Sequence, residues 1–239
     1  MPTLDIHGYQ DVYGWDFISG DPRPFDDQNH GTEIAGLVAV IAPQAKLMPL
    51  KIFNPWGMTN SASIYAAFEY AVVHGADIIV CAWATIRQSD ALEAGIRLAQ
   101  QKSIVVVAAA GDRGIDFSHI PFYPAAYAAQ YDNVIPIVAV DANDQRLSQP
   151  GLISSYSSKL AVFAAPGQSL QVAQPRNQTA TETSSALAAA IAAGALARVA
   201  AVDESKDFHH WVQSLKDQSD AVPGLQGFVQ GGRRIHLHE

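Results

Sequence analysis

The chain has 239 residues, of which 49% are apolar and only 16% are charged. This balance excludes disordered and fibrous proteins and favours one large globular domain, because single α/β domains often reach this size. Fifteen basic residues against 23 acidic ones give a net charge of −8. No basic surface is therefore expected for nucleic acid or for anionic lipid.

Cysteine content and hydropathy give little information about the compartment. Cys81 is the only cysteine, which excludes an intramolecular disulfide and a cysteine-rich zinc site. Residues 1–10 contain no basic region followed by an apolar run, so no secretory signal is expected, and a cytoplasmic protein or one trimmed of its leader fits equally well. The most apolar stretch, 186–202, is short and contains Arg198, which predicts a buried helix rather than a membrane span.

Short β-branched runs alternate with helical periodicity along the chain. This alternation is typical of βαβ units and predicts a mostly parallel twisted sheet with helices on both faces. The run at 103–110 is apolar throughout, as expected of an interior strand. Composition alone predicts loops at 151–158 and 168–181. Strands are expected at 47–53 (weakened by Pro49), 77–82, 103–110, 133–140 and 160–164, and helices at 61–74 (capped by Ser61), 91–101 and 186–202.

Four motifs stand in chain order at the ends of these elements. They are His30-Gly31-Thr32 at a helix start, Ala108-Ala109-Ala110-Gly111-Asp112 and Ala164-Ala165-Pro166-Gly167 after strands, and Thr183-Ser184-Ser185-Ala186 at the start of the Ala-rich helix. This succession resembles the subtilisin-like serine peptidases, and the resemblance covers nearly the whole chain. It implies one domain, residues 1–239, with a subtilisin-like three-layer α/β fold. It also implies that His30 holds the position of the catalytic base, Ser184 that of the nucleophile, and Asp112 that of the oxyanion-binding side chain.

The acid that should orient the base is not identified. The resemblance places it in an Asp-Ser/Thr-Gly turn after an early strand, but only 29 residues precede His30 and they contain no such turn. We therefore expect the domain to lack the family's first strand. If this leaves an exposed sheet edge, an N-terminal segment or another chain could pair with it. Among the acids of this region, none of Asp5, Asp11, Asp16, Asp26 and Asp27 fits the pattern.

Other departures fall where the chemistry should be. Asp112 replaces the family's Asn, and an ionised carboxylate there would repel the charge that it should stabilise. Burial and a second acid such as Glu182, which replaces a Gly, are both expected to raise the pKa of Asp112. At the substrate-binding segment, Ala82, Trp83 and Ala84 replace Ser-Leu/Trp-Gly.

Each of these residues also has a purely structural interpretation. His30 could cap a helix or lie on the surface, Ser184 could be an N-cap, and Asp112 could be a turn residue. The acidic run 141–144 is better explained by a turn than by calcium, because it lacks a recognisable loop signature. No metal site is expected from the histidines, since zinc needs three or four convergent ligands. The histidines considered for such a site are His209, His210, His236 and His238.

Two functions remain open, and neither requires a cofactor. The favoured one is a pseudoprotease that uses the old substrate groove to bind a peptide or protein and cuts weakly or not at all. The alternative is an active serine endopeptidase with Ser184 as nucleophile and His30 as base, its acid coming from an N-terminal segment or another chain. Fold alone does not decide between them.

Overall fold

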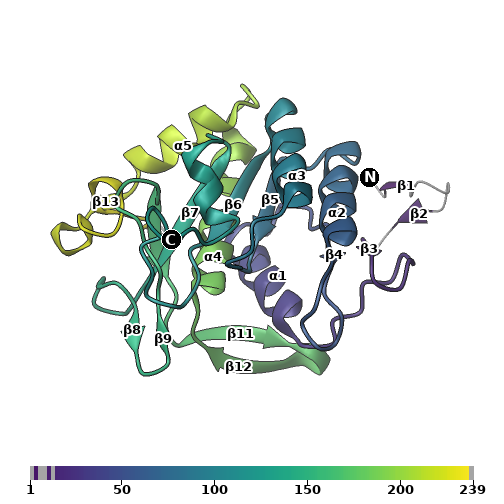
Figure 1. Cartoon of the computed structure of the whole chain (residues 1–239), viewed down its shortest axis with the longest axis horizontal. Helices are drawn as coiled ribbons and strands as arrows, with labels where there is room; N and C mark the ends of the chain where they lie inside the picture. The colour runs from purple at the N-terminus through teal and green to yellow at the C-terminus, as the bar shows by residue number, and fades with distance from the viewer. Residues whose placement is uncertain (1–2, 5–9, 12–13, 237–239) are drawn as a thin grey trace.

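A computed structural model describes residues 3–4, 10–11 and 14–236, of which the first two pairs are described by their backbone only. A six-stranded sheet forms its centre, in the order β13-β14-β10-β7-β6-β5 (Figure 1). The neighbours from β14 to β5 are parallel, and β13 pairs antiparallel with β14. The strands of this sheet are β5 (Ile78–Cys81), β6 (Val105–Ala109), β7 (Val134–Val140), β10 (Phe163–Pro166), β13 (Asp220–Ala221) and β14 (Arg233–Arg234).

Helices cover both faces of this sheet. One face packs against α1 (His30–Ile41), α4 (Ser185–Val202) and α5 (Phe208–Asp217). The other packs against α2 (Ser61–Val73) and α3 (Asp90–Gln101). These two layers of helices around the sheet give the three-layer α/β fold that the sequence predicts.

The interior strands are apolar in every position because they contact a core on each face. In β6, Val105 and Val107 belong to the core under α1 and α4, whereas Val106 and Ala108 belong to the core under α2 and α3. A strand that is covered on both faces has no solvent-facing positions, so its apolar residues do not alternate with polar ones. The same reasoning explains β7, in which all seven residues are buried.

The Ala-rich helix is a core helix, as predicted. It is apolar and long enough to cross a membrane by length and composition, but 72% of that stretch is buried inside the fold. Small side chains let α4 lie close to its neighbours. At Gly194, an added Cβ would come within 2.8 Å of the Cβ of Ile41 on α1. This close contact fixes α1 against α4.

Four short strand pairs lie outside the central sheet. β3 (Trp15–Asp16) pairs in parallel with β4 (Leu50–Lys51), and the other three pairs are antiparallel. Those three pairs are β1 (Thr3–Leu4) with β2 (Gln10–Asp11), β8 (Ser148–Gln149) with β9 (Leu152–Ile153), and β11 (Leu170–Gln174) with β12 (Gln178–Glu182).

Three details differ from the sequence predictions. The region 168–181 is largely a β-hairpin, β11–β12, rather than a loop, and it packs on α1, where a Cβ on Gly36 would come within 2.8 Å of the Cβ of Ala173. The strand expected at 47–53 is only two residues long. The cap of α2 is Asn60, one residue before Ser61, because the Asn60 side chain accepts a hydrogen bond from the N–H of Ser63 at 2.9 Å.

Within the described residues, the β5 end of the central sheet is a free edge. Among the residues that the structure describes, β5 pairs only with β6. Its residues Ile78, Ile79 and Val80 are half-buried, whereas their partners in β6 are fully buried. The sequence alone did not show whether such an edge would exist, and within the described residues β5 ends the sheet.

Candidate active site

The carboxyl ends of the parallel strands open into a groove of about 830 Å³. The start of α1 and the segments that follow β5, β6 and β12 bring together His30, Ala82, Trp83, Ala84, Asp112, Ser184 and Ser185, and the acids Glu33 and Glu182 also line the groove. Ligand sites of α/β proteins commonly lie beyond the carboxyl ends of the strands. All six residues that the sequence proposed for the site are therefore neighbours in space.

Ser184 is the N-cap of α4. Its Oγ accepts a hydrogen bond from the N–H of Leu187 at 3.2 Å, and its own N–H donates to the carbonyl of Gly167 at 2.9 Å. A side chain on Gly167 would come within 2.7 Å of the Ser184 carbonyl, so glycine permits this close approach. Ser184 thus caps the helix, as its structural interpretation from the sequence proposed.

Asp112 contacts the start of the same helix. Its Oδ1 accepts a hydrogen bond from the N–H of Ser185 at 2.9 Å, and the Ser185 Oγ accepts one from the N–H of Gly111 at 3.0 Å. Burial raises the pKa of Asp112 even though the Ser185 hydrogen bonds oppose the rise. The direction matches the sequence prediction, but Glu182 is not among the causes of this shift.

His30 begins α1 and lies half exposed at the groove. Its Nε2 is 2.8 Å from the carbonyl oxygen of Ala82, and among the described residues no hydrogen bond joins His30 to Ser184. Its Nδ1 is 4.0 Å from Oε2 of Glu33, which lies one turn further along the helix. Residues three apart on a helix share a face, so this neighbour could have been found from the sequence.

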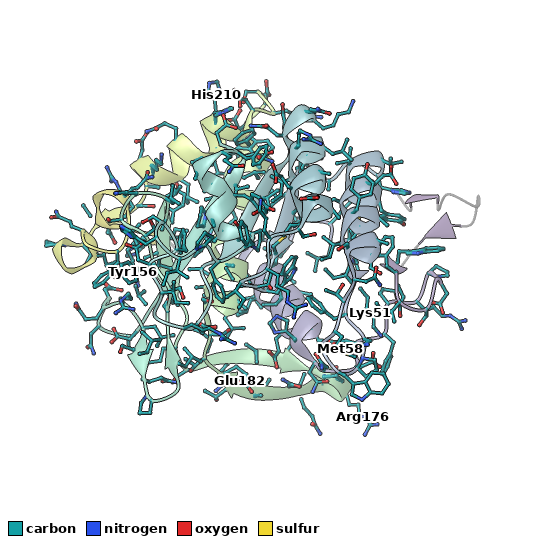
Figure 2. All side chains as sticks on the ribbon, in the orientation of Figure 1. Lys51, Met58, Tyr156, Arg176, Glu182 and His210 are labelled. Atoms are coloured by element: carbon teal, nitrogen blue, oxygen red, sulfur yellow. The ribbon has the colours of Figure 1, made fainter. Side chains whose placement is uncertain are left out.

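Glu33 is held by the β11–β12 hairpin. The Gln174 side-chain amide donates to its Oε1 at 2.6 Å, and the Glu33 side chain is only 12% exposed. Burial raises the pKa of Glu33, and Glu182 adds to the rise, although the Gln174 hydrogen bond and His30 act in the opposite direction. Figure 2 shows Glu182 and Arg176 toward opposite ends of this hairpin.

Three of the acids considered in the sequence have structural partners. Asp16 is buried and accepts hydrogen bonds from the N–H groups of Ile18 and Ser19, and its carboxylate lies 3.4 Å from Lys51. Asp27 also contacts Lys51. Asp26 accepts from both N–H and Oγ1 of Thr32 in the first turn of α1, at 2.7 Å each. Asp5 and the side chain of Asp11 lie outside the part that the structure describes.

The other polar clusters also have local partners. His209 lies between Asp132 and Asp207, at 3.0 and 2.9 Å, and His236 contacts Asp220, while His238 is outside the described residues. Within residues 14–236, no three or more His, Cys, Asp or Glu side chains form a group that could hold a metal. Asp141 accepts from the N–H groups of Asn143 and Gln145, which closes a turn.

Two features define the class of protein: a mostly parallel sheet in a three-layer fold, and a serine–histidine groove at its carboxyl edge. A family model described as "Subtilase family" matches residues 3–219, and the chain belongs to this family. Subtilisin DY of Bacillus licheniformis is 34% identical over 79% of this chain and 69% of its own length. Thermitase of Thermoactinomyces vulgaris is 27% identical over 93% of this chain and 78% of its own.

Solved structures show the same fold. A cold-adapted subtilisin-like serine proteinase superposes with a TM-score of 0.83, at 18% identity, over 95% of this chain and 81% of that one. A lanthipeptide protease superposes with a TM-score of 0.80, at 20% identity, over 93% of this chain and 78% of that one. The fold and family expected from the sequence motifs are thus confirmed.

Proposed function

We propose that this member of the subtilase family binds extended peptide segments in its groove and hydrolyses them weakly or not at all. The hydrogen bonds at the start of α4 carry the proposal. Acyl transfer needs N–H donors aimed at the oxyanion of the tetrahedral intermediate. Here the N–H groups of Ser184 and Ser185 already donate to Gly167 and Asp112, and a carboxylate stands at the expected oxyanion position.

A backbone segment of the groove supports the binding part of the proposal. Within the described part of the chain, the backbone of Trp83 and Ala84 has no backbone hydrogen-bond partner. An extended peptide that pairs with such a segment gains main-chain hydrogen bonds without depending on catalytic groups. The residues 82–84 expected to contact substrate are therefore proposed as the binding wall.

A titration with fluorescein-labelled casein, which is unfolded, tests this proposal. We expect saturable binding that weakens at least about tenfold in Ala84→Pro, because proline removes the backbone N–H. Ala84→Val is the matched control, since it adds bulk but keeps that N–H. Thermal unfolding of both variants verifies that they fold. Equal affinity of the two folded variants, or no binding by the unmodified chain, would contradict the proposal.

A second candidate is active endopeptidase chemistry with an acid supplied by an N-terminal segment or another chain. The free edge of β5 favours it, because His30 contacts the carbonyl of Ala82, the residue that follows β5. A strand added to this edge in parallel would end beside His30. Synthetic strand peptides that end in Asp-Ser-Gly or Asn-Ser-Gly distinguish this candidate: only the Asp peptide should induce Ser184-dependent cleavage.

A further inference from the structure

The partner of His30 within its own helix suggests a role for an acid that the family resemblance does not assign. We propose that Glu33 is the positioning residue of His30, which orients the imidazole and favours its cationic form. The inference deepens the proposed function, since it concerns the same groove and rests on that assignment. It does not depend on whether peptide bonds are cut.

The hydrogen-bond partners of the ring determine where its protons lie. A carbonyl oxygen can only accept, so the contact with Ala82 assigns a proton to Nε2 of His30. In the neutral ring Nδ1 then has a lone pair facing Oε2 of Glu33 at 4.0 Å. Protonation of Nδ1 replaces this unfavourable contact with an ion pair. Glu33 therefore interacts favourably with the ring when Nδ1 carries a proton, while Nε2 contacts Ala82.

Glu33 is fixed in the orientation that this role requires. Gln174 binds its Oε1, which leaves Oε2 directed toward Nδ1 of His30. The hairpin that carries Gln174 is itself packed on α1 through Ala173 and Gly36. One carboxylate oxygen is thus anchored and the other faces the ring.

The charged surroundings of this pair are mostly acidic. Asp26 precedes the helix, Glu182 ends β12, and both oppose ionisation of Glu33. Asp112 and Arg113 line the same groove. Because Glu33 is the acid within 4.0 Å of the ring, its removal should affect His30 more than removal of Glu182 does.

Imidazole ¹⁵N NMR titration of the histidine-labelled chain tests the proposal directly. We expect Glu33→Gln to lower the proton affinity of His30 about two- to fivefold, the range for partly exposed ion pairs. Glu33→Asp keeps the charge at a greater distance and should give an intermediate value. Added salt should reduce the difference between Glu33→Gln and the unmodified chain.

Glu182→Gln is the matched control, because it removes one charge from the same groove without touching His30. An unchanged proton affinity in Glu33→Gln, or an equal decrease in Glu182→Gln, would overturn the proposal. The casein titration separates the two proposals. If casein fails to bind while the His30 signals shift as expected, the proposed function fails and the role of Glu33 stands.

Discussion

Replacement of Ser184 separates its structural role from its chemical one. Its Oγ caps α4 by accepting the Leu187 N–H at 3.2 Å, and loss of an N-cap acceptor costs about 1 kcal/mol. For a domain of this size, such a loss lowers the melting temperature by about 2–4 °C. Ser184→Ala should show this decrease. Ser184→Asn should not, because its side-chain carbonyl can accept the same hydrogen bond.

Thermal unfolding followed by circular dichroism measures both variants in one buffer, and casein hydrolysis is recorded in parallel. Both variants should lack any Ser184-dependent cleavage, whereas only the alanine variant should lose stability. Equal stability of Ser184→Ala and the unmodified chain would show that the cap contributes nothing. A decrease of the same size in Ser184→Asn would show that the cost comes from another source, such as packing in the groove.

Three further substitutions test the contacts around the site. Ser185→Ala should destabilise the fold by about 1–3 kcal/mol in urea unfolding, because it leaves the Gly111 N–H without its acceptor. Asp112→Asn should stabilise the chain increasingly as the pH rises from 4 to 7. In the folded chain the pKa of Asp112 is raised, so its carboxyl binds a proton more tightly than in the unfolded chain. As the pH rises above the ordinary pKa of an aspartate, the unmodified chain therefore loses stability, whereas Asp112→Asn has no carboxyl to ionise at this position. Lys51→Met should cost about 3 kcal/mol at pH 7, since it leaves the buried Asp16 carboxylate without its cation, and the cost should shrink as Asp16 is protonated in acid.

The interior of the fold could be predicted from the sequence because burial on both faces leaves a distinct pattern. The continuous apolar runs of β6 and β7 and the Ala-rich α4 were all placed correctly to within two residues at each end. The β11–β12 hairpin was missed because its strands are largely exposed and polar, so that only the short alternation of Leu170, Gln171 and Val172 marks them. Its turn also uses left-handed conformations at Arg176 and Asn177 rather than at glycine.

The sequence predicted which residues line the site but not the hydrogen bonds between them. The motifs located His30, Asp112 and Ser184, and the structure brings them into one groove. The partner of His30 escaped notice because an acid was sought before the helix rather than within it, although helical spacing points to Glu33. The contacts of Ser185 with Gly111 and Asp112 join positions more than 70 residues apart, which no local pattern encodes.

Peptide turnover tests the central claim most directly. The purified chain and its Ser184→Ala variant are incubated at neutral pH with a quenched fluorescent peptide library. The protein concentration is one at which labelled casein is fully bound in the titration described above. The account predicts binding with little or no cleavage, because the N–H donors at the start of α4 are engaged and Nε2 of His30 contacts the carbonyl of Ala82. Rapid cleavage by the unmodified chain that disappears in Ser184→Ala would contradict it.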